Sequence, residues 1–403
     1  MTGAPTTAEP PTVPTDPAPA YRVPADFVPA ETRTMGTVHN ALRRDLPRVR
    51  AVLDTLPYPH DRQRVALADH LLMMMAFLHK HHSAEEIGLY PLVRRDPAAA
   101  ALLDEMEADH DALDPGIAAV ESAARAYRLD AAAREAVIAA LDLLNPVLMP
   151  HLDREEQLLM PVVERTVSKA EWDAWEKGIA KGRSLGELAT EGHWILDGAT
   201  PDEVDLMLAL VPGPMRWILL NVSGRGHRKR AFARWWTQEY SPWKVACGGS
   251  NSVTVSASPE QVWAVLTDVT RVGEWSHECR SARWLAGSGG VGARFVGANQ
   301  AAWSRWKRPC VVTAWEPGRL FAFRTQGPRL VRDCSEWTFA LEPVPGGGTR
   351  ITQTFRILSL PVPVERLIWL TLPPHRIAPP PSPATSSASA PSPPAAATPV
   401  RKG

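Results

Sequence analysis

Two stretches of the chain carry the same arrangement of histidine and glutamate at an offset of 70 residues. In the first stretch His81 is followed four positions later by Glu85, and in the second His151 is followed by Glu155. Residues four apart lie on one face of a helix, so each pair would present an imidazole beside a carboxylate. The residues around each pair make that face otherwise apolar, and a carboxylate buried there is costly unless it is paired or bound to a metal. The repeated spacing therefore predicts metal ligands.

A single histidine precedes each pair. His39 and His110 stand 71 residues apart, so they occupy matching places in the two halves. The predicted ligand set has four imidazoles and two carboxylates: His39, His81, Glu85, His110, His151 and Glu155. This set suits two metal ions, each with two terminal imidazoles and both bridged by the carboxylates. It favours iron or manganese over a closed structural zinc site.

Neighbouring residues compete for a place at this centre. His82 follows His81 directly, but it matches Leu152 in the second half, so the repeat disfavours it as a ligand. Glu86 and Glu156 each follow a predicted ligand. We expect these two acids at the surface or behind a ligating histidine, which they would orient.

Four helices must carry these residues. Helical periodicity with few glycines and prolines predicts them at about 33–56, 62–94, 98–127 and 131–167. On the second helix His70 faces away from the predicted ligands and is expected at the surface. Asp114, one turn after His110, either reaches the metal or precedes a bend at Pro115.

The pattern of a lone histidine, His-x-x-x-Glu, a lone histidine and His-x-x-x-Glu resembles the hemerythrin-like, or HHE cation-binding, family. The resemblance spans about residues 34–165 and covers all six predicted ligands. It implies an all-α, up-down four-helix bundle with a non-haem di-iron site. Hemerythrins that carry oxygen have a fifth histidine where this chain has Asp114. The resemblance therefore leaves open oxygen, nitric oxide or redox sensing and iron handling.

Composition divides the chain into five parts. Residues 1–31 are rich in Pro and Ala and predict a disordered arm, and residues 32–168 form the predicted bundle. Residues 169–248 predict additional helices and a linker. Residues 249–376 predict a second domain, and residues 377–403 predict a disordered tail rich in Pro, Ser and Ala.

The second domain begins near Ser250, where the apolar period switches to two. Its segments Val253–Asp268, Glu316–Phe321 and the run from Trp337 resemble the polyketide cyclase/START-like (SRPBCC) superfamily. That resemblance implies an α+β helix-grip fold, in which a curved antiparallel sheet wraps a helix and encloses a cavity for a hydrophobic small molecule. No catalytic set is recognisable, and His277 is expected in a loop.

The remaining composition argues against several classes of protein. Lys+Arg and Asp+Glu both number 44, so no net charge favours a nucleic-acid partner, and the basic stretch at 225–236 is expected to be a solvated helix end. The four cysteines form no CxxC pair, the N-terminus lacks a secretory signal, and no apolar run could span a membrane. We expect a soluble, cytoplasmic protein.

Together these features predict a metal-binding protein with two non-haem irons per chain, manganese or zinc being less favoured. The centre would bind or sense oxygen, nitric oxide or redox state, and the second domain would hold an apolar ligand. The alternative is a di-iron oxidase or oxygenase that acts on that ligand. We favour a binding or sensing protein over an enzyme, and the sequence identifies no catalytic residue.

Overall fold

The computed structural model describes residues 21–360, except for residues 22, 182, 212, 214–215, 217–223, 244–245, 302–303 and 328–332. Most of the predicted arm, the end of the predicted second domain and the whole predicted tail at 377–403 lie outside the described residues. Two compact units make up the chain. One comprises residues 1–54 and 59–230, and the other residues 55–58 and 231–403.

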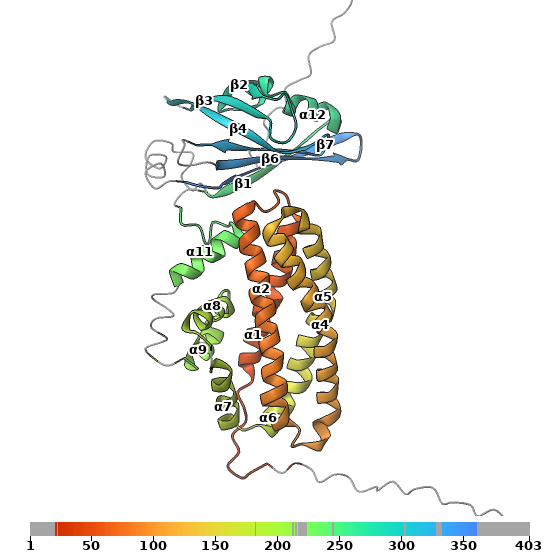
Figure 1. Cartoon of the computed structure of the whole chain (residues 1–403), viewed down its shortest axis with the longest axis vertical. Coiled ribbons are helices and arrows are strands. Elements are labelled where there is room, and N and C mark those ends of the chain that lie inside the picture. The colour runs from red at the N-terminus through yellow and green to blue at the C-terminus, as the bar shows by residue number, and fades with distance from the viewer. Residues whose placement is uncertain are drawn as a thin grey trace, which may run out of the picture. The chain divides into compact units, whose positions relative to one another are not determined.

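Four long helices lie side by side in the first unit (Figure 1). They are α1 (Arg33–Asp54), α2 (Asp61–Ala84), α4 (Ala100–Leu129) and α5 (Arg134–Arg154). Both α1 and α4 pack against α2 and α5, so helices consecutive in the chain are neighbours in space. Apolar residues at helical spacing fill the interior, and on α1 the fully buried ones are Leu42, Leu46, Val49 and Leu53. The predicted all-α fold of this region is confirmed.

The second and fourth helices both change pitch at the same place in the repeat. A π-helical turn follows each, η1 (Glu85–Leu89) after α2 and η4 (Glu155–Leu159) after α5, before α3 (Tyr90–Val93) and α6 (Met160–Thr166) resume the helix. The helices predicted at about 62–94 and 131–167 are present, and each contains one π-helical turn. A proline is the second residue after each turn, and proline has no N–H for the carbonyl four residues back. One α-helical hydrogen bond is therefore lost after each turn. π turns of this kind are frequent at functional sites.

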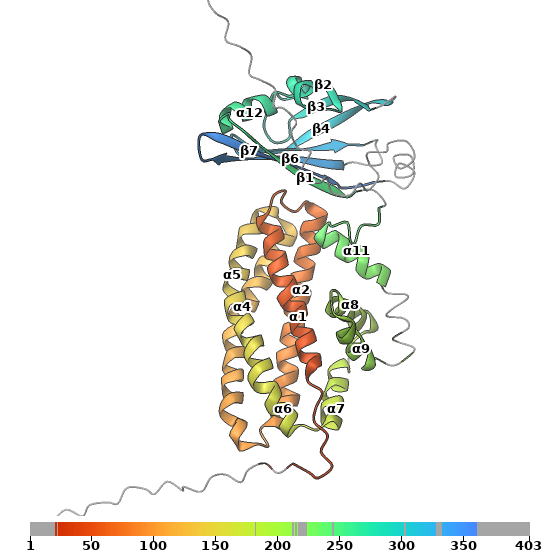
Figure 2. The ribbon, with the colours of Figure 1, turned by 180° about the vertical axis from the view of Figure 1, so that it is seen from behind.

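Further helices lie against the outer side of α1 and α2 (Figure 2). They are α7 (Lys169–Ala180), α8 (Leu185–Leu196) and α9 (Pro201–Ala209), and α11 (Gly224–Trp235) follows in the chain. Capping boxes begin α7, α8 and α9, with Ser168, Ser184 and Thr200 as the capping residues. Short 3₁₀ turns, η2 (Pro97–Ala99) and η3 (Ala131–Ala133), precede α4 and α5. No helix in the described ranges is both long enough and apolar enough to cross a bilayer.

The covering helix α8 explains one failed prediction. His70 was expected at the surface, but only 3% of it is exposed. Its Nε2 lies 2.7 Å from Oδ2 of Asp45 on α1, and Nε1 of Trp194 on α8 donates to the same oxygen at 3.0 Å. Burial alone would raise the pKa of Asp45, but hydrogen bonds from His70 and Arg44 outweigh it and hold that pKa well below its usual range. The face of α2 that carries His70 therefore packs against α1 and α8 and does not face water.

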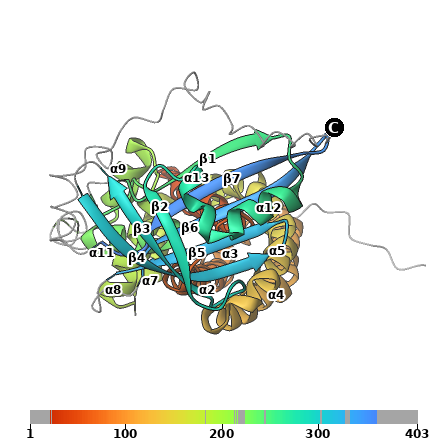
Figure 3. The same ribbon diagram turned by 90° about the horizontal axis from the view of Figure 1, so that it is seen from above.

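The second unit is a seven-stranded antiparallel sheet in the order β1-β7-β6-β5-β4-β3-β2 (Figure 3). Its strands are β1 (Gly248–Val255), β2 (Cys279–Ala286), β3 (Arg294–Ala301), β4 (Ser304–Glu316), β5 (Leu320–Gln326), β6 (Asp333–Val344) and β7 (Gly348–Ile357). Between β1 and β2 lie α12 (Pro259–Thr267), η6 (Val269–Arg271) and α13 (Val272–Trp275). Ser258 caps α12 through a capping box with Gln261, and Val262 and Leu266 pack into the apolar side of the sheet. The predicted helix-grip fold class is confirmed.

Candidate metal centre

All six predicted ligands are buried within the helical unit. One comes from α1, one from α2, one from α4 and one from α5, and the two glutamates begin η1 and η4. Their exposed fractions run from 0% to 7%: His39 0%, His81 7%, Glu85 0%, His110 4%, His151 0% and Glu155 0%. The structure therefore brings the whole predicted set to the interior of the bundle.

Three of these residues, which come from both halves of the repeat, form one of two groups within the cluster. Nε2 of His39 lies 3.1 Å from Nε2 of His81, and 3.4 Å from Oε2 of Glu155. Two atoms bound at right angles to one metal, each by a bond of about 2.1 Å, are about 3.0 Å apart. The spacing of these atoms is thus what a shared ion requires, and the three residues form a group that could hold one.

The two carboxylates reach both halves of the cluster. Oε1 of Glu85 lies 3.0 Å from Nε2 of His81, while its other oxygen, Oε2, lies 3.6 Å from Nε2 of His110. Oε2 of Glu155 lies 3.4 Å from Nε2 of His39 and 4.0 Å from Nε2 of His151. Each glutamate therefore stands where a bridging carboxylate would.

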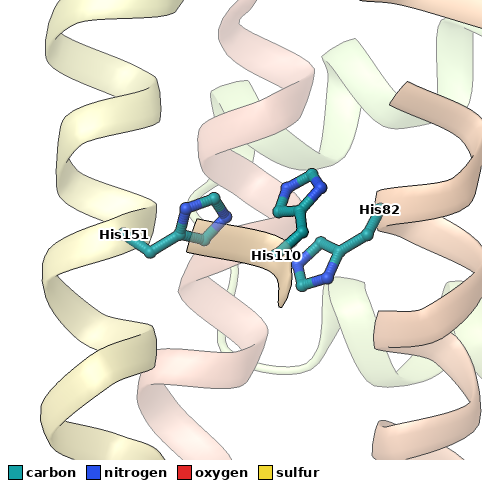
Figure 4. A group of neighbouring side chains, drawn as sticks. All are labelled: His82, His110 and His151. Atoms are coloured by element: carbon teal, nitrogen blue, oxygen red, sulfur yellow. The ribbon is translucent and has the colours of Figure 1, made fainter. Parts of the chain in front are cut away.

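His82, which the repeat disfavoured, also points into the cluster. Only 6% of it is exposed, and its ring stacks on that of His110 with centroids 4.0 Å apart and 9° between the planes. His82, His110 and His151 form a second group that could hold a metal ion, with rings that converge from three helices (Figure 4).

The second acid of each Glu-Glu pair lies behind a histidine of the other half. Oε1 of Glu86 lies 2.6 Å from Nδ1 of His110, and Oε1 of Glu156 lies 2.7 Å from Nδ1 of His39. A carboxylate at Nδ1 fixes the ring and its tautomer, so that the opposite nitrogen, Nε2, is free to bind a metal. Arg43 donates to the same oxygen of Glu156 at 2.7 Å. Of the two placements that the sequence left open for these acids, the structure shows them behind the histidines.

Apolar side chains and one phenol enclose the cluster. Leu78, Leu89, Leu148 and Leu159, at matching positions in the two halves, are fully buried. Oη of Tyr90 lies 3.4 Å from Nε2 of His110. Burial, and after it the charge of Glu85, raise the pKa of this phenol far above its usual value, so it remains protonated. The cluster therefore has little access to water.

Burial also shifts the pKa values of the acids and histidines themselves. Burial, together with the nearby charge of Glu155, raises the pKa of Glu85 well above its ordinary value, and burial raises that of Glu155. Burial and the neighbouring imidazoles lower the pKa of His81 well below its ordinary value, and they lower that of His151 to about 4. Without a cation, burial thus disfavours the charged forms of Glu85, Glu155, His81 and His151.

Residues 31–170 match the family model of the hemerythrin HHE cation binding domain, and residues 248–370 match that of polyketide cyclase / dehydrase and lipid transport. The chain joins a hemerythrin-like domain to a polyketide cyclase-like domain. No curated protein matches the chain.

Solved structures similar to the chain include a polyketide cyclase-like protein of Corynebacterium glutamicum. It is 27% identical over 31% of this chain and 72% of that chain, with a TM-score of 0.23. The Zhui aromatase/cyclase of Streptomyces sp. R1128 is 18% identical over 28% of this chain and 68% of that chain, with a TM-score of 0.24. A protein of Mesorhizobium loti is 24% identical over 30% of this chain and 83% of that chain, with a TM-score of 0.22.

The polar atoms of the hemerythrin-like domain fit a bound metal pair. None of the four carboxylate oxygens of Glu85 and Glu155 takes part in a hydrogen bond of normal geometry with a described residue, and the same holds for both ring nitrogens of His151 and for Nε2 of His82. Buried polar atoms are almost always paired, so unpaired acceptors that face one another indicate a missing cation. Mixed imidazole and carboxylate donors suit iron or manganese.

Two other polar residues of the hemerythrin-like domain lie outside the centre. Asp114, for which the sequence left a metal contact open, has a side chain 65% exposed, and its Oδ1 lies 4.0 Å from Nδ1 of the half-exposed His79. It therefore does not take the place of a further ligand on α4.

The polyketide cyclase-like domain packs its apolar side with aromatic residues. Trp263 of α12 lies edge-on to Trp315 and Phe321, and Trp275 lies edge-on to Phe339. These aromatic residues belong to the hydrophobic core of the domain, and the family match suggests that such a domain has a ligand-binding cavity.

Proposed function

We propose that the hemerythrin-like domain holds two iron ions through His39, His81, Glu85, His110, His151 and Glu155, and that this centre binds or senses oxygen, nitric oxide or redox state. The observation that carries the proposal is the position of Glu85. Its two oxygens face histidines of different halves, at 3.0 Å from His81 and 3.6 Å from His110, with no hydrogen-bond donor of normal geometry among the described residues.

Iron at this place would supply one-electron redox chemistry and coordination positions for a small ligand. The protein's own residues prepare the site. Glu86 and Glu156 orient His110 and His39 from behind, and the surrounding leucines exclude water. Exclusion of water strengthens the attraction between the two carboxylates and a cation, because the local dielectric constant is low.

The proposal is tested by metal content. Full-length protein is loaded anaerobically with iron, freed of unbound metal, and analysed for iron per chain and for its ultraviolet-visible spectrum. His151→Ala and Glu85→Ala are measured beside it, with His79→Ala as the control, because His79 is half-exposed and outside the cluster. About two irons per chain in the wild type and the control, with loss in both variants, supports the centre. Iron that is not retained, or that is unaffected by either substitution, rejects it.

Titration of the loaded protein with oxygen and nitric oxide then separates sensing from catalysis. Stoichiometric, reversible spectral change supports a binding or sensing function. Continuous consumption of oxygen and a reductant, dependent on an added apolar compound, supports the oxidase alternative instead.

We propose that the polyketide cyclase-like domain binds an apolar small molecule on its aromatic face. Trp263 and Trp315 are only partly buried and lie edge-on to one another beside the buried Phe321, and aromatic side chains of this kind are typical of hydrophobic ligand sites. The test is native mass spectrometry of the full chain after incubation with polycyclic aromatic compounds and with fatty acids. Binding that Trp263→Ala weakens supports this site, and equal affinity in the variant and the wild type rejects it.

A further inference from the structure

The two halves of the centre differ in their imidazoles. The repeat matches His81 with His151, but His82 matches Leu152, a fully buried leucine. We propose, on the basis of the proposed metal function, that His82 is a fifth imidazole ligand. One metal is then held by His82, His110 and His151, and the other by His39 and His81, so the two ions are chemically different.

The position of α2 explains how adjacent residues serve different ions. Successive side chains on an α-helix point about 100° apart. Because α2 packs against both α1 and α4, this step directs His81 toward α1 and His82 toward α4. Nε2 of His81 accordingly lies 3.1 Å from that of His39, whereas the ring of His82 lies 4.0 Å from that of His110.

The surroundings of His82 indicate a ligand. Its ring nitrogens can approach those of His110 and His151 so that one atom from each residue lies within 4.8 Å of the others. His82 is buried, and its Nε2 takes part in no hydrogen bond with a described residue. A structural imidazole in the core would satisfy this nitrogen, whereas a metal ligand leaves it available. Figure 4 shows the rings of His82, His110 and His151 next to one another inside the helical unit.

Unequal ligand numbers predict unequal affinities. The ion bound by three imidazoles has one more protein donor than the ion bound by two, so a chelator should remove the latter first. Loss of a group that merely supports a ligand lowers metal affinity about 10- to 100-fold, and loss of His82 itself should be at least as large for the ion that it binds.

The decisive variant is His82→Leu, which places in the first half the residue that the second half already has. His79→Leu is the matched control, since it introduces the same side chain at an exposed position of the same helix. Iron per chain is followed against increasing concentrations of a chelator, and Mössbauer spectra of the iron-57-loaded proteins report whether the two irons are equivalent.

The wild type and the control should lose iron in two separate steps and give two spectral components of equal area. In His82→Leu we expect the tighter step to weaken by about 100-fold or more, with the two components converging. Wild-type retention and spectra in His82→Leu, while His151→Ala loses iron, would overturn the inference and leave the metal centre intact. A wild type that binds no iron would overturn both.

A second variant covers the case in which leucine disturbs the packing. His82→Gly leaves a space that free imidazole can enter. Recovery of the tighter step on addition of imidazole, without recovery on addition of similar-sized cyclopentanol, supports ligation by His82. Absence of any recovery in a folded His82→Gly protein contradicts it.

Discussion

Removal of the carboxylate behind His110 should weaken the binding of one metal ion, although that carboxylate is not itself a proposed ligand. Glu86 does not face the cluster, but its Oε1 lies 2.6 Å from Nδ1 of His110. This charge-assisted hydrogen bond holds the ring with Nε2 inward and makes that nitrogen a stronger donor. We therefore choose Glu86→Ala, which removes the acceptor, and Glu86→Gln, which keeps an oxygen acceptor but removes the charge.

The structure sets the size of the effect. Loss of such a partner typically weakens metal affinity about 10- to 100-fold, which is about 1.4 to 2.8 kcal/mol. The side chain of Glu86 is 41% exposed, so water can replace part of the lost hydrogen bond. We expect about 30-fold for Glu86→Ala and about 10-fold for Glu86→Gln, limited to the ion that His110 binds.

Competition with a chromophoric chelator under anaerobic conditions measures both losses. Glu105→Ala is the control, because Glu105 is an exposed acid on the same helix as His110. The equivalent change in the second half, Glu156→Ala, also removes the ion pair to Arg43 and is therefore the less specific test. Unchanged affinity in Glu86→Ala, in a protein that loses iron on His110→Ala, would refute the reasoning.

Three further outcomes are expected. Metal binding should release protons, because burial raises the pKa of Glu85 and Glu155 in the metal-free protein. Calorimetry with Mn²⁺ in buffers of different ionisation enthalpy measures this release, and identical heats in all buffers would contradict it. Gly88→Ala should lower the free energy of unfolding by about 1 to 3 kcal/mol, because the added Cβ would lie 2.6 Å from Cδ1 of Trp175. The control Gly178→Ala, whose Cβ would meet nothing within 4 Å, should not lower it. Equal unfolding midpoints of the two variants in urea would contradict this prediction. Asp45→Asn should lower the free energy of unfolding by about 3 kcal/mol. Because the folded pKa of Asp45 is depressed, its contribution is present above the unfolded pKa and is lost as the pH falls below it, so the wild type and the variant should converge in acid unfolding curves.

The sequence predicted which residues come together in the bundle because two independent spacings agree there. Helical spacing places His81 with Glu85, and the offset of 70 residues places the same pair again at His151 and Glu155. Apolar residues at the same helical positions predicted which face would be buried. The fold of both units followed from the same kind of signal, since a period of 3.6 gives way to a period of two near Ser250.

Other features depended on tertiary structure that these periods do not encode. His70 is buried because α8 covers its face with Trp194, and periodicity within the bundle does not show which outer face receives a fifth helix. The π turns were not predicted. Pro91 and Pro161 stand at the same place in both halves, six residues after the predicted glutamate ligands. Pro146 and Pro150, however, lie within the α-helix α5, so a proline alone does not predict a change of pitch.

The repeat makes the two halves of the proposed centre similar. The residues that differ between the halves indicate how the surroundings of the two proposed ions differ. The glutamates, the π turns, the supporting acids and the flanking leucines are shared. Among the positions that differ are His82 against Leu152, Gly88 against Leu158, and Tyr90 against Met160. In the α2–η1–α3 segment the ring of His82 stacks on His110, and the phenol oxygen of Tyr90 lies 3.4 Å from His110. Gly88, which has no side chain, leaves room for the ring of Trp175. Because His82 and Tyr90 both lie against His110, the ion proposed at His110 would have neighbours for which the other half has no counterpart. Exchanging each residue for its counterpart removes one difference at a time and leaves the shared frame in place.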